Sequence, residues 1–179
     1  MSRGLGDVYK RQMDDRSVSF GTDALGTVTF HGHGGSSVLG QWDDVTPHAY
    51  EEVWDTTSGA DRRIDGRSGN NLITYDSPSF SGVQFKMAHQ VDHQTSTTGQ
   101  AAQNYDLGQY TDFGIQVSPE MVEGLTVGYG FGELDDSTST SIDNETIFVK
   151  YAVGGFTLGY QTHEADSSVA ADNDCLLYT

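Results

Sequence analysis

The side chains of this sequence that could take part in chemistry are mainly carboxylates and histidines in polar stretches. His31 and His33 are the only close pair among six histidines, and at this spacing they would share one face of a strand. Such a pair supplies at most half of a metal site, and a solvated pair at the mouth of a loop is the simpler interpretation. The sequence has no nucleophile motif and no catalytic constellation, so it predicts a protein that is not an enzyme.

A second group of reactive side chains is a run of acids between residues 43 and 55. Its members are Asp43, Asp44, Glu51, Glu52 and Asp55. Other acids lie in proposed loops, as at 133–136 and 164–174, and loop carboxylates are the hard oxygen ligands that Ca²⁺ prefers. No spacing matches an EF-hand or a glycine–aspartate nonapeptide repeat, so the sequence predicts no cofactor, with loop Ca²⁺ as the alternative. The net charge of −17 argues against nucleic acid as a partner, since that needs a basic footprint.

Alternation of large apolar side chains with small or polar ones indicates the β-strands that must position these residues. Residues 125–133 read Leu-Thr-Val-Gly-Tyr-Gly-Phe-Gly-Glu, with large apolar side chains on one face of a strand and Thr or Gly on the other. Repeated alternation over segments of about 10 residues is typical of a transmembrane β-barrel. The fold expected is therefore all-β, an antiparallel up-and-down transmembrane β-barrel. The expected strands are residues 16–22, 26–32, 70–76, 82–91, 107–118, 124–133, 145–153 and 155–164.

The links between these strands alternate in length. Short links at 23–25, 77–81, 119–123 and 154 alternate with long polar links at 33–69, 92–106 and 134–144. Outer-membrane barrels have short periplasmic turns and longer external loops. A soluble barrel has no physical reason to sort its loops in this way. The hydrophobic content of 35% leaves no run near the ~20 apolar residues of a membrane helix, but a barrel exposes only alternate residues to lipid.

The two ends of the chain look foreign to the rest. Residues 1–12 contain Asp-Val-Tyr-Lys-Arg-Gln, and residues 175–179 read Cys-Leu-Leu-Tyr-Thr. Both resemble translated adaptor sequence at the ends of assembled gene fragments, and the first lacks the apolar centre of a secretory signal. We therefore expect a non-native leader at 1–12, a native β-barrel segment at 13–174 that is an internal piece of a longer protein, and a non-native tail at 175–179.

The order of motifs around the longest loop resembles the Gram-negative general porins. Gly-Thr-Val-Thr-Phe at 26–30 ends a strand and is followed by Gly-Gly-Ser-Ser-Val-Leu-Gly-Gln-Trp-Asp-Asp-Val-Thr-Pro at 34–47. Asp-Gly-Arg-Ser-Gly-Asn-Asn follows at 65–71, and Tyr-Asp-Ser-Pro-Ser-Phe-Ser-Gly at 75–82. In general porins a third loop folds into the lumen at this point. The resemblance implies about eight strands of a sixteen-stranded barrel, because a loop as long as 33–69 would not fit an eight-stranded lumen.

The resemblance also implies a function and a site. The function is passive diffusion of small hydrophilic solutes and ions through an outer-membrane pore, with loop 33–69 as the constriction. In such pores loop acids face wall arginines, and Arg67 matches the position of one of them, with Arg62 and Arg63 nearby. Lys86 and Lys150 share the lumen-facing phase of their strands, since a lipid-facing Lys costs ~2–4 kcal/mol at the midplane. The expected constriction residues are Asp43, Asp44, Glu51, Glu52, Asp55, Arg62, Arg63 and Arg67.

The partners implied are outer-membrane lipid, permeating solutes and ions, and two further copies in a homotrimer. Trp42 and Trp54 would pack the loop against the wall or bind a sugar face. Two alternatives stay open at this point. One is a soluble acidic β-sandwich or lectin-like binding module that uses these tryptophans and the loop carboxylates, and the other is a small β-barrel membrane anchor.

Overall fold

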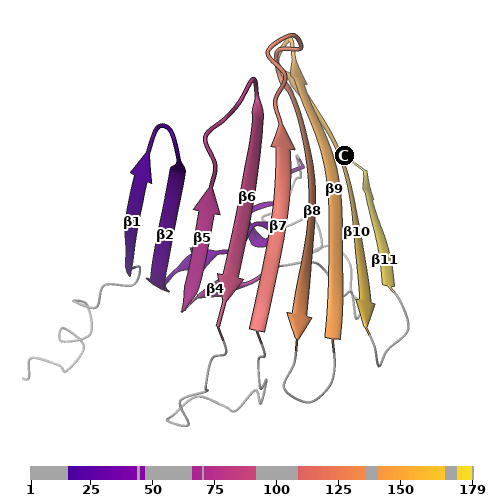
Figure 1. Cartoon of the computed structure of the whole chain (residues 1–179). Coiled ribbons are helices and arrows are strands. Elements are labelled where there is room, and N and C mark those ends of the chain that lie inside the picture. Colours follow the sequence, from indigo (N-terminus) through magenta and orange to yellow (C-terminus); the bar gives the residue numbers. More distant parts are fainter. Residues whose placement is uncertain are drawn as a thin grey trace, which may run out of the picture.

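The computed structural model describes residues 16–43, 45–46, 66–69, 71–91, 109–135, 141–167 and 173–178. Within these ranges the chain forms one antiparallel sheet of nine strands, in which each strand pairs with the next along the sheet. Figure 1 shows this sheet as a curved wall. Its strands, in spatial order, are β1 (Arg16–Thr22), β2 (Gly26–His33), β5 (Leu72–Asp76), β6 (Val83–Gln90), β7 (Gln109–Val117), β8 (Leu125–Asp135), β9 (Ser141–Val153), β10 (Phe156–Ser167) and β11 (Asn173–Tyr178).

A smaller element lies between β2 and β5. The strands β3 (Gly35–Ser36) and β4 (Ser68–Gly69) pair with each other, and the 3-10 helix η3 (Leu39–Gln41) follows β3. In Figure 1 these elements lie within the curve of the large sheet. We call the side of the sheet on which they pack the inner face, and the opposite side the outer face.

The predicted all-β antiparallel fold is confirmed, and all eight expected strands are present with small differences in length. β9 begins at Ser141 rather than at 145, and β10 ends at Ser167 rather than at 164. In this added length Asp143 pairs with Asp166 and Ile142 with Ser167. The ladder continues where the hydrophobic alternation has ended, because backbone pairing does not require apolar side chains. The ninth strand, β11, was not expected, and it pairs with β10 over residues assigned in part to the non-native tail.

The two faces of the sheet differ sharply in composition. The cross-strand row Ala88, Asp112, Gly132 lies on the inner face, whereas Met87, Phe113, Phe131 form the neighbouring row on the outer face. Large hydrophobic side chains on the outer face are exposed, including Phe131 at 50%. The buried core instead lies on the inner side, where Val45 packs on its edge. Its members are Val38, Leu39, Trp42, Leu72, Ala88 and Phe148.

Carboxylates gather on the outer face where β8, β9 and β10 approach their long links. Glu133 lies opposite Asp143, and Asp143 lies opposite Asp166. Glu145 and Glu164 form a further like-charged pair in the next row. Together the five acids line a hollow of about 420 Å³ that Phe113 and Phe131 also border. The outer face therefore changes from an apolar band to an acidic band near this end.

The short turns cluster at the other end of the sheet, at the top of Figure 1. Two of them depend on a glycine in the left-handed region, because Gly82 and Gly124 both have φ of 84°. A Cβ at either position would also collide with a backbone oxygen, that of Ser118 or that of Ala152. Among the described residues, no helix has the length and apolar character needed to cross a bilayer.

Candidate functional site

The candidate site is the place where the long loop between β2 and β5 packs on the inner face of the sheet. We call residues 35–43 and 66–69 the loop root, since they are the outgoing and returning ends of this loop. The two ends are tied together beside the β3–β4 pair. The amide of Ser37 donates to the carbonyl oxygen of Arg67 over 2.7 Å, and the amide of Arg67 donates to the Ser37 hydroxyl over 2.9 Å.

Asp112 on β7 holds the outgoing end of the loop root. Its Oδ1 accepts a hydrogen bond from the amide of Val38 at 3.2 Å, and its Oδ2 accepts one from the amide of Leu39 at 2.8 Å. The Tyr110 hydroxyl, on the same strand and face, donates to Oδ2 at 3.1 Å. Asp112 is 0% exposed, and these donors replace the hydrogen bonds to water that its carboxylate loses on burial.

Glycines on β7 and β8 leave room for the loop to approach the sheet. A Cβ on Gly130 would lie 2.7 Å from Trp42 Cζ3 and 2.8 Å from Leu39 Cδ2, and a Cβ on Gly114 would collide with the Trp42 ring. The indole therefore lies directly against the backbone of two neighbouring strands. The glycines that alternate with large side chains in the sequence form the floor of this socket.

Two further strands hold Trp42 in place. The Phe148 ring on β9 packs edge-on against the indole, with ring centroids 5.3 Å apart. Gln161 on β10 donates from Nε2 to the backbone oxygen of Trp42 at 2.6 Å, and its side chain is buried. Val38, Leu39 and Trp42 thus make contact with four consecutive strands, β7 to β10.

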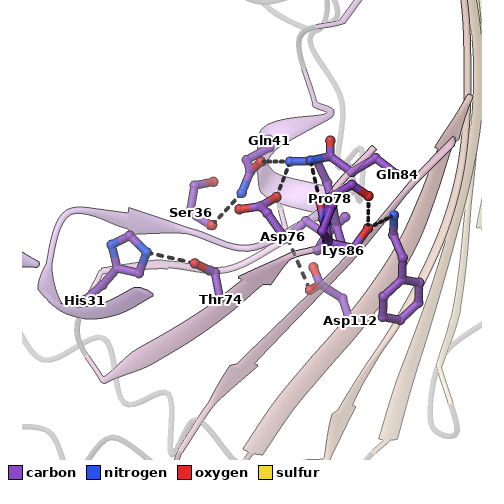
Figure 2. Close-up of polar contacts among 12 residues, drawn as sticks. His31, Ser36, Gln41, Thr74, Asp76, Pro78, Gln84, Lys86 and Asp112 are labelled. Carbon is purple, nitrogen blue, oxygen red and sulfur yellow. Dashed lines mark hydrogen bonds and ion pairs between the residues drawn. The ribbon is translucent and has the colours of Figure 1, made fainter. Parts of the chain in front are cut away.

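Lys86 on β6 joins the loop to the wall near η3. Its Nζ donates to Asp76 Oδ1 on β5 at 2.6 Å and to Gln41 Oε1 at 3.1 Å, while the Gln41 amide group donates to the oxygen of Ser36. Figure 2 shows Lys86 between these two partners. Because Asp76 and Lys86 carry opposite charges, their fields largely cancel at a distance.

Arg67 lies on the returning end of the loop root. Its guanidinium carbon is 5.9 Å from the centroid of the Tyr110 ring, within the range of a cation–π contact. Burial lowers the pKa of Arg67 from its ordinary value. A guanidinium starts from so high a pKa that it stays charged at neutral pH. Tyr110 thus contacts both Asp112, which binds the outgoing end of the loop root, and Arg67, which lies on the returning end.

The structure describes some of the expected site residues and not others. Asp43 directly follows Trp42 and is half-buried. Lys150 lies on the inner face of β9, two residues from Phe148 and opposite Thr126 and Gly159. Six of the expected constriction residues lie outside the described residues, as does Trp54. They are Asp44, Glu51, Glu52, Asp55, Arg62 and Arg63.

Three important contacts of the loop root were missed from the sequence, those of Tyr110, Asp112 and Gln161. A carboxylate that alternates with apolar residues in the middle of a strand was the available signal for Asp112. The histidine pair is also resolved, and His31 Nε2 is 3.1 Å from the Thr74 hydroxyl (Figure 2). Within the described ranges no three His, Cys, Asp or Glu side chains are grouped to hold a metal ion.

Comparison with known proteins identifies the family. A model of the Gram-negative porin family matches residues 7–178, which is nearly the whole chain. It includes residues 7–12 and 175–178, whose non-native origin stays a prediction. A search of curated proteins returned no match. The curved antiparallel sheet, with an apolar outer face and a loop packed on its inner face, has the form of a partial porin barrel. The chain belongs to the family of Gram-negative porins, which are channels of the outer membrane.

Proposed function

We propose that this chain forms part of the wall of a passive diffusion channel for small hydrophilic solutes and ions, in which loop 33–69 narrows the pore. The observation that carries the proposal is the packing of the loop root on the inner face. Trp42 is only 3% exposed there, and its backbone and ring are held by β8, β9 and β10. A loop fixed in this way occupies part of the cross-section that the curved wall encloses.

The wall itself suits a water-filled pore surrounded by lipid. Apart from the core under the loop, side chains of the inner face include Gln84, Gln116 and Thr126, while the outer face presents exposed aromatic and aliphatic groups. Nine strands with this curvature enclose one side of a wide lumen, and we propose a complete barrel of about sixteen strands. Outer-membrane lipid surrounds it, and three such barrels assemble as a homotrimer.

Fixed charges around the loop would set the selectivity of the channel. We propose that loop carboxylates face Arg67 and its neighbours Arg62 and Arg63 across the constriction, with Lys86 and Lys150 on the surrounding wall. Opposed charges in a narrow ring create a transverse field, and a ring dominated by one sign selects ions of the other sign. The proposed carboxylates are Asp43, Asp44, Glu51, Glu52 and Asp55.

The decisive experiment is a measurement of conductance by the complete barrel that contains this segment. Discrete conductance steps in a planar bilayer, together with swelling of vesicles in small sugars, are expected for a diffusion channel. Folded barrels that migrate differently in detergent before and after heating, yet give no conductance, would show a membrane anchor instead. A chain that stays monodisperse in water without detergent would point to the soluble binding module.

A further inference from the structure

One carboxylate of the inner face accepts hydrogen bonds from two successive backbone amides of the loop, and we infer that Asp112 is the positioning residue that fixes the loop root to the wall. On this inference residues 37–42 behave as part of the barrel wall and not as a movable lid. The inference deepens the proposed function, and rests on it where pore size is concerned.

The geometry of Asp112 fixes both the place and the orientation of the loop. Its two oxygens accept from two successive amides, those of Val38 and Leu39, just where η3 begins. The first amides of a helix have no partner within the helix, so they need an outside acceptor when buried. A bidentate acceptor prevents rotation as well as translation of the segment. The Val38 and Leu39 side chains remain available to pack in the core.

Asp112 also connects the two ends of the loop through Tyr110. The Tyr110 hydroxyl donates to Asp112, and the Tyr110 ring lies beneath the guanidinium of Arg67 on the returning end. Arg67 in turn exchanges two hydrogen bonds with Ser37, one residue before Val38. Loss of the carboxylate would therefore loosen the outgoing end first and the returning end through it.

Burial separates this role from that of a selectivity charge. The Asp112 side chain has no exposed surface, and a permeating ion could not reach it while the loop is docked. A carboxylate is needed at this position because its neighbours are donors, namely two backbone amides and the hydroxyls of Tyr110 and Ser37. Asparagine would keep one acceptor oxygen but would direct an NH₂ group at an amide donor. Hydrogen bonds to a charged acceptor are the strong class, so their loss should lower the ratio of docked to undocked loop by about 10- to 100-fold.

The test uses Trp42 as a reporter of loop position. The sequence has two tryptophans, so Trp54→Phe leaves Trp42 as the single fluorophore. The 179-residue chain carrying this change is refolded in detergent, and its β-sheet content is checked by circular dichroism. Acrylamide quenching is then compared among this parent, Asp112→Asn and Asp112→Ala. Asp143→Asn is the matched control, since it removes the same charge from the outer face of β9.

We expect both Asp112 variants to give a red-shifted emission and a several-fold larger quenching constant, and Asp143→Asn to match the parent. Tyr110→Phe should lie between them, because it removes one donor and no charge. It serves as the test variant if neither Asp112 variant folds. A folded variant in which Trp42 stays as protected as in the parent would overturn the inference.

The same variants are then measured in the complete barrel. A larger conductance and a higher size limit for sugars would support the positioning role at the constriction. If Trp42 becomes accessible while the conductance stays unchanged, the positioning role stands and the proposed constriction fails. The two failures are therefore distinguishable.

Discussion

Trp42 and Phe148 meet edge to face on the inner side of the sheet, with ring planes at 71°. Phe148 reaches this position because β8 has glycine beside it, and a Cβ on Gly128 would collide with the Phe148 ring. Close packing among these three residues holds the loop root in place, independently of the hydrogen bonds that Asp112 accepts.

Replacing Trp42 by alanine should detach the loop root and leave the barrel folded. Loss of a buried tryptophan typically costs about 3–5 kcal/mol, and here that loss falls on the loop's attachment rather than on the strand ladder. We expect normal heat-modifiable migration and faster swelling of vesicles in larger sugars. Phe156→Ala is the control, since Phe156 is 75% exposed beside a short turn. An unchanged sugar size limit would place Trp42 away from the conducting path.

Replacing Gly128 by alanine should destabilise the wall as well as the loop. The added methyl group collides with the Phe148 ring, and overpacking of this kind costs about 1–3 kcal/mol. The measurement is the temperature at which the heat-modifiable form is lost in detergent. Gly32→Ala is the matched control, because a Cβ there meets its nearest neighbour at an ordinary 3.6 Å. Equal melting temperatures for the two variants would contradict the close approach.

Replacing Lys86 by glutamine should make the pore more selective for cations. The change removes a positive charge and leaves Asp76, which Lys86 contacts at 2.6 Å, without that partner on the inner face. The double variant Asp76→Asn with Lys86→Gln restores the original net charge and should return the reversal potential in a salt gradient close to its starting value. Equal reversal potentials for the parent and Lys86→Gln would show that this pair lies outside the ion path.

Arg67→Ala should also raise cation preference, while Asp43→Asn together with Asp44→Asn should shift it toward anions. Both shifts should shrink at high salt, because the Debye length falls from about 10 Å at 0.1 M to about 3 Å at 1 M. Reversal potentials at both ionic strengths give the measurement. Since Arg67 also contacts Tyr110, its variant should widen the pore slightly. Reversal potentials that stay unchanged in both variants would argue against the proposed ring of charges.

Asp143→Asn should stabilise the barrel at low salt. Asp143 lies directly opposite Glu133 on one side and Asp166 on the other, and like charges in facing positions are destabilising by roughly 0.2–1 kcal/mol per pair. The gain should fade as salt is added. Thermal loss of the heat-modifiable form at two ionic strengths provides the measurement, and a gain that is equal at both would require a cause other than repulsion.

Much of the sheet could be predicted because its strands have one lipid-facing side. Leu125, Val127, Tyr129 and Phe131 alternate with small residues, and β8 contains all of them. The ends of β9 and β10 were less predictable, since Asp143 and Asp166 pair in the ladder without any apolar signal. The helix η3 has one turn and no side-chain cap, so it leaves little mark on the sequence.

The site was less predictable than the sheet because its contacts use the backbone. Asp112 binds amides 73 and 74 residues away, and Gln161 binds a carbonyl 119 residues away. Backbone donors and acceptors are present at almost every position, so sequence patterns give no indication of which ones meet. The resemblance to porins singled out Arg67 as a candidate, but nothing in the sequence indicated its contact with Tyr110.

The separation along the chain between the loop root and its contacts has a consequence for biogenesis. The loop is synthesised before β7, β8, β9 and β10, and it cannot dock until these strands stand side by side. Bringing together residues that are so far apart in the sequence costs conformational entropy, and this cost is offset only when the final contacts form. Docking of the loop root therefore follows the pairing of these later strands. Burial of Trp42 is thus a built-in marker that β7 to β10 have paired.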